Sequence, residues 1–152
     1  MKRKIVLLFW VLPMIAAEPE GYKYWSTADL KSSAKTLATK LDAQKFASDR
    51  LAEFGNHYAL LAHREGSGQP EFHANEVDVF FVSSGSATLI VGGTLRDGKT
   101  TAPGEIRGGT IEGGTRQKIS AGDVVHIPSK TPHQLLLEPG AQFTYFVLKV
   151  KE

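Results

Sequence analysis

The sequence contains no cysteine among its 152 residues. Disulfide bonds, thiolate zinc sites, thiol catalysis and lipidation at a cysteine are therefore excluded. The chain also carries little surplus charge, since 18 Lys and Arg stand against 16 Asp and Glu and give a formal net charge of +2. A balance of this kind does not predict the basic surface that nucleic acids or anionic membranes require, so we expect no nucleic-acid partner.

Residues 1–17 have the three-part layout of a secretory signal peptide. Met1-Lys-Arg-Lys4 is basic, the stretch from Ile5 to Ile15 is apolar, and Ala16-Ala17 precedes Glu18. The apolar stretch is shorter than the ~20 residues that cross a bilayer, which favours a cleaved signal over an uncleaved single anchor. We therefore expect export to the periplasm or the extracellular space, with no stable membrane insertion after cleavage.

Cleavage after Ala17 would remove three basic residues and no acidic ones. The mature chain would then hold 15 Lys and Arg against 16 Asp and Glu, so its net charge is close to zero. What remains is long enough for one hydrophobic core. We divide it into an N-terminal arm and helix over residues 18–45 and one domain over residues 46–152.

The segment 18–45 begins with an aromatic stretch, Tyr22 to Trp25, that we expect to pack on the domain. Ser26-Thr-Ala-Asp29 resembles a capping box. The apolar residues that follow recur at helical spacing: Leu30, Ala34, Leu37 and Leu41. The pattern predicts one α-helix, from about Thr27 to Asp42, that lays its apolar stripe on the outside of a sheet.

From Phe46 onward the pattern is that of short strands. We expect strands at Phe46–Phe54, His57–Arg64, Glu71–Ala74, Val77–Ser83, Ser86–Val91, Arg116–Ser120, Val124–Ile127, His133–Leu137 and Gln142–Val150. The glycine-rich segment 92–114 has no phosphate-loop pattern and predicts turns. Many short strands with a single helix at the front predict an all-β jelly-roll barrel or sandwich.

Two spaced motifs in this region resemble those of the cupin superfamily. The first cupin motif is usually His-x-His, three or four spacers, Glu, six spacers and Gly. Glu71-x-His73, four spacers, Asp78, six spacers and Gly85 have this spacing, with Glu in place of the first His and Asp in place of Glu.

The second cupin motif is usually Gly, five spacers, Pro-x-Gly, two spacers, His, three spacers and Asn. Gly122, Pro128 and His133 match it, while Lys130 and Leu137 stand where Gly and Asn are usual. The resemblance covers residues 60–150 and is to a small, single-domain, secreted cupin of type 2. It implies a double-stranded β-helix, the jelly-roll barrel of this superfamily.

Carried over position by position, the resemblance implies that Glu71, His73, Asp78 and His133 surround one divalent metal ion. Two imidazoles and two carboxylates suit Fe(II), Mn(II), Ni(II), Cu(II) or Zn(II). The alternative is that the two carboxylates lie near solvent at strand ends and the two histidines are remnants of a site that no longer binds.

The remaining histidines of this region are less suited to a metal. In the run Asp123-Val-Val-His126-Ile-Pro128, His126 shares a face with Val124 and is expected at the surface or behind the ligands. We expect His63 to lie at a solvated strand end. The alternative is that His63 replaces the first metal ligand of the motif. We expect His57 to lie at a turn.

Two functions from different classes fit these features. In the first, an exported enzyme, an oxygenase or isomerase, uses the metal on a small oxygen-rich molecule. In the second, the barrel binds a small molecule or a metal without turnover. A homodimer formed through the arm is a further expectation, with the alternative that the arm covers its own barrel.

Overall fold

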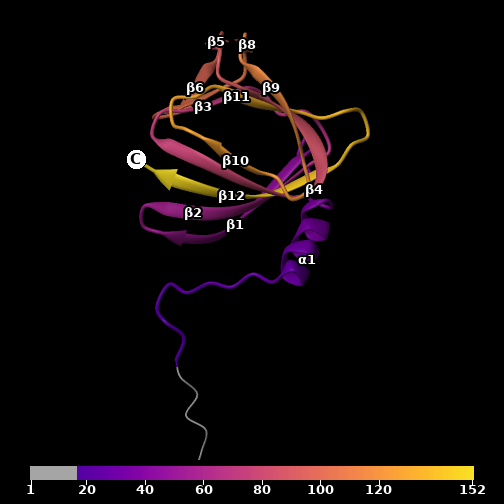
Figure 1. Ribbon diagram of the computed structural model, residues 1–152, viewed down its shortest axis with the longest axis vertical. Helices are drawn as coiled ribbons and strands as arrows, with labels where there is room; N and C mark the ends of the chain where they lie inside the picture. The colour runs from indigo at the N-terminus through magenta and orange to yellow at the C-terminus, as the bar shows by residue number, and fades with distance from the viewer. Residues whose placement is uncertain (1–16) are drawn as a thin grey trace, which may run out of the picture.

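A computed structural model describes residues 17–152 of the chain (Figure 1). The signal peptide predicted over residues 1–17 lies outside this range except for its last residue. The described part has the helix α1 (Thr27–Leu37) and the strands β1 (Phe46–Phe54), β2 (His57–Arg64), β3 (Glu71–His73), β4 (Glu76–Val91), β5 (Thr94–Arg96), β6 (Lys99–Ala102), β7 (Glu105–Arg107), β8 (Thr110–Glu112), β9 (Thr115–Ser120), β10 (Val124–Ile127), β11 (His133–Leu136) and β12 (Phe143–Lys151).

Helix α1 begins with the capping box that the sequence predicts. The Asp29 amide donates to Ser26 Oγ over 3.1 Å, and the Ser26 amide donates to Asp29 Oδ2 over 3.2 Å. The helix ends at Leu37, earlier than the predicted Asp42, because the Thr39 and Lys40 amides bond three residues back and tighten the chain into a turn. At 11 residues it is far too short to span a bilayer, and residues 17–152 hold no helix that does.

The β1–β2 hairpin confirms the predicted strands and their Gly55-Asn56 turn. Gly55 has a φ of 66°, which the first central residue of a two-residue II′ turn requires. Leu61 on the outer face of β2 packs with Ala47 of β1 and Leu37 of α1, so the helix covers the outside of this hairpin as predicted.

Strand β4 spans the two strands predicted at Val77–Ser83 and Ser86–Val91. Its first half pairs with β12 and β10, and its second half pairs with β11 and β9. The change of partners occurs at Gly85, whose φ is 79° and where a side chain would overlap the carbonyl oxygen of Gln142. The predicted corner therefore exists as a bend within one strand.

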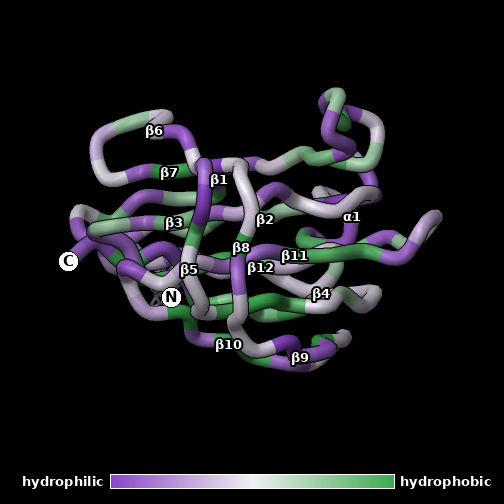
Figure 2. The backbone as a smooth tube through the Cα atoms, turned by 90° about the horizontal axis from the view of Figure 1, so that it is seen from above, coloured by the Kyte–Doolittle hydropathy of each residue, from purple (hydrophilic) through white to green (hydrophobic). Residues whose placement is uncertain are grey.

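All strand pairs are antiparallel, and the main sheet has the order β1-β2-β12-β4-β11-β3-β7-β6, with β9 and β10 paired to β4. This sheet curls around an apolar core (Figure 1, and Figure 2 from above). The buried members of that core are Ala62, Phe80, Val82, Ala87, Leu89, Ile119, Ile127, Leu135, Phe143, Tyr145 and Val147. The all-β jelly-roll with one N-terminal helix is confirmed.

The glycine-rich segment 92–114 contains the predicted turns, for example at Pro103-Gly104, but short strands that the sequence did not predict lie between them. It forms the β5–β8 pair, which stands at the top of Figure 1, and the β6–β7 pair, whose inner strand joins β3. These strands have three or four residues and are mostly exposed, so they lack the apolar alternation that identifies longer strands.

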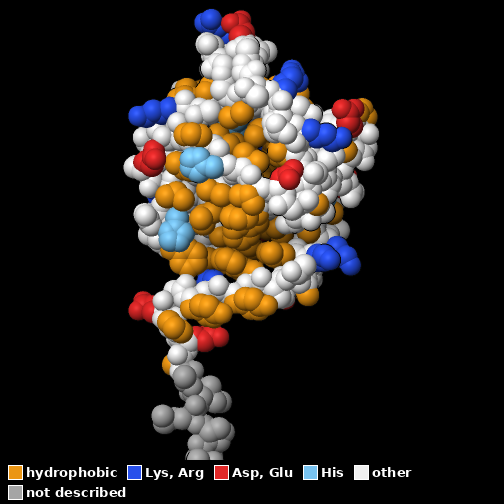
Figure 3. Space-filling model, in the orientation of Figure 1, with side chains coloured by type: hydrophobic (Ala, Val, Ile, Leu, Met, Phe, Trp, Pro, Cys, Tyr) orange, Lys and Arg blue, Asp and Glu red, His pale blue; other side chains and the backbone are white. Residues whose placement is uncertain are grey.

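Apolar side chains gather over the face formed by β10, β4 and β12 (Figure 3). Phe81 is 43% exposed because neighbouring residues of a strand point to opposite faces and Phe80 takes the inward position. Phe81 contacts Phe146, and Trp25 of the arm packs on Phe146 with ring centroids 5.5 Å apart. The arm thus covers its own barrel at Trp25, which is the alternative to a dimer formed through the arm. Tyr24 is exposed.

Candidate metal centre

The structure brings the four predicted ligands together inside the barrel. Glu71 and His73 lie on β3, Asp78 lies on β4 and His133 begins β11. Pairing of Glu71 with His133 places β3 beside β11, and β11 in turn pairs with β4. His73 Nε2 lies 3.6 Å from Glu71 Oε2 and 3.5 Å from Asp78 Oδ2, which is also 3.5 Å from His133 Nε2.

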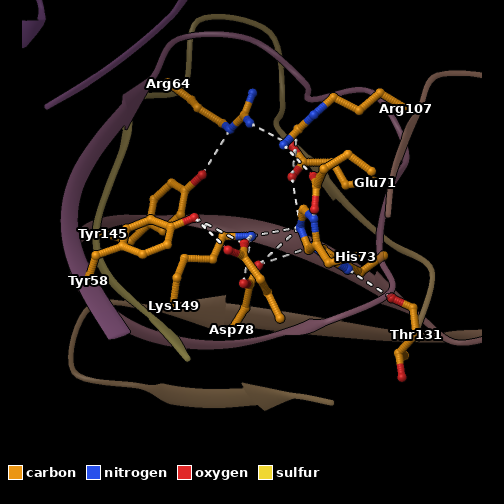
Figure 4. Close-up of polar contacts among 12 residues, drawn as sticks. Tyr58, Arg64, Glu71, His73, Asp78, Arg107, Thr131, Tyr145 and Lys149 are labelled. Carbon is orange, nitrogen blue, oxygen red and sulfur yellow. Dashed lines mark hydrogen bonds and ion pairs between the residues drawn. The ribbon is translucent and has the colours of Figure 1, made fainter. Parts of the chain in front are cut away.

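Both imidazoles are held through Nδ1, which leaves Nε2 facing the centre. His133 Nδ1 lies 3.0 Å from the Thr131 carbonyl oxygen and His73 Nδ1 lies 2.7 Å from Glu105 Oε2 (Figure 4). Because these oxygens only accept, Nδ1 donates in both rings, and Nε2 of the neutral ring carries the lone pair. His133 Nε2 is buried without a hydrogen-bond partner.

Two arginines hold the Glu71 carboxylate. Arg107 Nη1 lies 2.9 Å from Oε2, and Arg64 Nη2 donates to Oε1 over 3.3 Å. Burial alone would raise the pKa of this carboxyl. The close contact with His73 and the positive charges of Arg107 and Arg64 outweigh burial and lower the pKa to about 2. Glu71 is therefore ionised at neutral pH, as a ligand must be.

Asp78 is 2% exposed and is also held in its charged form. Burial acts to raise its pKa, but the close contacts with His133 and His73, each 3.5 Å away, and the charge of Lys149 hold the pKa well below its usual range. Two carboxylates with such low pKa values are good metal ligands and weak bases. Their surroundings therefore make both carboxylates unsuited to act as a general base.

Lys149, on β12, is a member of the cluster that the sequence motifs did not indicate. Its Nζ atom lies 2.7 Å from Asp78 Oδ1, 2.8 Å from His73 Nε2 and 3.7 Å from Glu76 Oε2. Asp78 Oδ1 has no aligned hydrogen-bond donor, so the contact with Lys149 is an ion pair. A separation of 2.8 Å between two nitrogens leaves room for one N–H, so the His73–Lys149 pair carries a single positive charge.

The carboxylates around His73 favour a positive charge on the His73–Lys149 pair in the absence of a metal. Burial lowers the pKa of the imidazole, while the close contacts with Asp78 and Glu71 raise it, against the opposing charge of Lys149, to about 9. A metal ion at Nε2 must therefore displace a proton from this pair.

The centre forms part of the wall of a cavity of about 690 Å³. Glu71, Asp78 and Lys149 lie in this wall together with Phe80 and two tyrosines, Tyr58 and Tyr145. The Tyr145 hydroxyl accepts from Arg64 Nε over 3.1 Å, and the Tyr58 hydroxyl donates to Glu76 (Figure 4). The cavity has the size of sites that take small molecules.

Five residues of the site were not predicted from the sequence: Arg64, Glu105, Arg107, Tyr145 and Lys149. Glu105 and Arg107 belong to the segment predicted as turns. Lys149 had a recognisable signal, because it is a charged residue that follows Phe143, Tyr145 and Val147 on the inward face of β12.

The other histidines lie elsewhere. His126 is exposed, as predicted, and His57 stacks on Phe54. The prediction of a solvated His63 is wrong, because this residue is 4% exposed and its Nδ1 lies 2.8 Å from Thr144 Oγ1 of the neighbouring β12. His63 shares the outer face of β2 with Leu61, so it points away from the metal centre and is no replacement ligand.

No protein-family model matches the chain, and no curated protein does. Several solved structures match with TM-scores just above 0.5. The polyketide cyclase RemF from Streptomyces resistomycificus is 18% identical, with a TM-score of 0.51 over 74% of this chain and 69% of its own. A Cupin 2 conserved barrel domain protein from Salinispora arenicola is 19% identical, with a TM-score of 0.50 over 73% and 79%. The chain has the cupin fold.

A third cupin-fold neighbour is the nucleoside dehydratase Pac13 of Streptomyces, which is 9% identical with a TM-score of 0.52 over 73% of each chain. At such identities the likeness concerns the fold alone.

One position of the second motif keeps the expected backbone conformation although its residue differs from the usual one. Lys130, at the usual glycine position, has a φ of 58°, a conformation that glycine adopts without cost. Its amide donates to the His73 carbonyl oxygen over 2.7 Å, so this turn holds the strand that carries two of the predicted ligands. Lys130 thus has a backbone conformation that suits the usual glycine of this motif.

Proposed function

We propose that this chain is an exported cupin that binds one divalent transition-metal ion through Glu71, His73, Asp78 and His133. The observation that carries the proposal is the orientation of the two imidazoles. Each is anchored through Nδ1 to an acceptor and directs Nε2 to the same place, the arrangement by which proteins orient histidine ligands.

The spacing of the donor atoms supports the same ligand set. Metal–nitrogen and metal–oxygen bonds are about 2.0–2.2 Å long, so two ligands lie about 2.8–3.1 Å apart at octahedral angles and about 3.3–3.6 Å apart at tetrahedral angles. The distances from His73 Nε2 to both carboxylates and from His133 Nε2 to Asp78 are 3.5–3.6 Å. The buried and unpartnered His133 Nε2 would gain a partner from the ion.

The charges of the surrounding residues also favour an added cation. Four carboxylates lie in the contact network of His73: Glu71, Glu76, Asp78 and Glu105. They are opposed by Arg64, Arg107 and the single charge of the His73–Lys149 pair. One negative charge is left over, and burial of uncompensated charge is costly.

The same balance indicates the class of substrate. With a divalent ion in place and both imidazoles neutral, one positive charge is left over among these groups. A substrate with one anionic oxygen group would neutralise it. We therefore propose a small oxygen-rich anion that fits the cavity of about 690 Å³ as the molecule on which the protein acts.

The chain's own residues have separate roles in this proposal. The metal would act as a Lewis acid on a substrate oxygen, or it would serve to activate oxygen. Arg64 and Arg107 keep Glu71 ionised and aimed at the centre, and Glu105 orients His73. Phe80 and Tyr145 form an apolar wall of the cavity and limit the access of water to the reacting atoms.

The reaction is an oxygenation or an isomerisation in this proposal. RemF is a polyketide cyclase and Pac13 a nucleoside dehydratase, so barrels of this architecture act on small oxygen-containing molecules by several chemistries. A binding barrel without turnover is the second candidate, favoured by one observation: Lys149 contacts two of the four predicted ligands.

Metal analysis of protein purified without chelator tests the proposal. We expect about one ion per wild-type chain, none in His73→Ala or His133→Ala, and an unchanged content in His126→Ala, whose histidine is exposed on β10. Metal that survives both ligand substitutions would refute the assignment.

Turnover separates the two candidates. The metal-loaded protein is incubated with catechols, diketones, oxalate and sugar acids, and oxygen consumption and product formation are followed. Activity that is lost in His133→Ala supports the enzyme. Metal uptake with no turnover of any of these compounds favours the binding barrel.

Export is proposed from the predicted signal peptide. The N-terminal residue of the protein recovered from the periplasm or medium of an expressing culture, determined by mass spectrometry, tests it. A mature chain that begins near Glu18 is expected, and an intracellular chain that begins at Met1 would contradict export.

A further inference from the structure

We infer that the Lys149 amino group occupies the donor atoms of the metal-free centre and that a metal ion must displace it to bind. The inference rests on the proposed metal function, and it concerns a residue that neither cupin motif includes. The side chain reaches the centre from β12, the strand next to the one that carries Asp78.

The geometry places this amino group between the predicted ligands. Nζ lies 2.7 Å from Asp78 Oδ1 and 2.8 Å from His73 Nε2, and the side chain is 9% exposed. Lys149 pairs in register with Asp78 across the β12–β4 ladder, so both side chains emerge at the same point of the sheet. The lysine therefore contacts two groups that a metal would take as ligands.

Two cations cannot share these donors. An ion about 2.0–2.2 Å from His73 Nε2 and Asp78 would lie within a few ångströms of Nζ, and His73 Nε2 cannot donate its lone pair to a metal and to an N–H at once. The contact between Lys149 and His73 must break when the metal binds.

The structure offers the displaced ammonium a second partner. Glu76 Oε2 lies 3.7 Å from Nζ, and the Glu76 carboxylate is held by the Tyr58 hydroxyl over 3.0 Å. The flexible four-carbon stem of lysine permits such a shift. Glu76, Tyr58 and Lys149 all line the cavity, so the shifted ammonium would stay beside the place where an anionic substrate binds.

A substitution of Lys149 tests the competition, with Lys151→Met as a matched control. Lys151 lies two residues further on the same face of β12 and lines the same cavity, but it pairs with Glu53 and touches none of the four predicted ligands. Both substitutions replace a lysine that lines the cavity by an uncharged side chain of similar length. Zn²⁺ affinity is measured by competition with a chelating dye.

We expect Lys149→Met to bind Zn²⁺ at least about tenfold more tightly than the wild type, and Lys151→Met to differ by less than about threefold. Unchanged binding by Lys149→Met would show that the lysine does not compete with the metal. Weaker binding would show that the lysine is itself a metal ligand. Either result would overturn the inference.

A second measurement needs no metal and separates this inference from the proposed function. In protein stripped with chelator, Lys149→Met should lower the melting temperature by roughly 5–10 °C, because the buried Asp78 carboxylate loses its closest ion-pair partner, at 2.7 Å. Asp78→Asn in the same chain should restore part of this loss.

The two experiments have separable outcomes. Absence of Zn²⁺ binding in both the wild type and Lys149→Met would refute the metal function, and the stripped protein would then decide the role of Lys149. Additive effects of Lys149→Met and Asp78→Asn in that protein would overturn the inference, and partial restoration would support it.

Discussion

His73 Nδ1 lies 2.7 Å from Glu105 Oε2, and this contact joins β3 to β7 at the centre of the site. The carboxylate fixes both the orientation of the imidazole and the nitrogen that faces the cluster. A strand from the glycine-rich segment therefore positions a histidine of the first motif.

Glu105→Gln tests this role. The amide oxygen can still accept from Nδ1, but the lost charge makes the imidazole a weaker ligand, so Zn²⁺ affinity should fall about tenfold or more. Affinity is measured by competition with a chelating dye, and Glu112→Gln, at an exposed glutamate of β8 that pairs with Arg96, serves as control. Equal affinities of the two variants would contradict the positioning role.

The pKa of Glu71 predicts how its contribution to stability depends on pH in chelator-treated protein. The folded pKa of about 2 is below the model-compound value of 4.5, so the stabilisation is present above pH 4.5 and is lost as the pH falls towards 2. The difference in unfolding free energy between the wild type and Glu71→Gln, at most about 3 kcal/mol, should shrink over this range. Denaturant titrations between pH 2 and 7 measure it, and a constant difference would show that the charge of Glu71 is not involved.

Gly85→Ala should destabilise the barrel by more than about 3 kcal/mol, because the new methyl group overlaps the Gln142 carbonyl oxygen at the bend of β4. Gly140→Ala is the matched control, since its φ of 78° is nearly the same and its surroundings are open. It should cost only about 1 kcal/mol, through backbone strain. Similar losses in denaturant unfolding would show that the overlap is relieved.

Lys130→Gly should stabilise the protein by about 1 kcal/mol, because the left-handed backbone of this exposed residue is unfavourable for any side chain. Lys118→Gly, at an exposed position within β9, should instead destabilise it, since glycine weakens a strand. Thermal unfolding of both variants checks the opposite signs. A loss of stability in Lys130→Gly would indicate that its side chain makes a contact that offsets the strain.

Much of the fold follows from local sequence patterns. The β1–β2 hairpin agrees with its prediction residue for residue because its turn residues and flanking strands are local features. The four predicted ligands converge because motif spacing determines which residues of β3, β4 and β11 face the barrel. Their role as ligands stays a prediction.

The residues that surround these four predicted ligands could not be predicted from local sequence patterns. Glu105 and Arg107 lie on a three-residue strand whose pairing with β3 depends on the whole sheet. His63 is buried because β12, some 80 residues later in the chain, covers it with Thr144. Lys149 could have been noticed as a charge on an apolar face, but its partners could not, since they come from other strands.

The most direct measurement of the central claim is a crystal structure of the protein with Zn²⁺, with the ion located by anomalous scattering. The account predicts one peak per chain, about 2.0–2.2 Å from Nε2 of His73 and of His133 and bound by the carboxylates of Glu71 and Asp78, with Lys149 moved away from His73. No peak at this position, with Lys149 still in contact with His73 and Asp78, would contradict it.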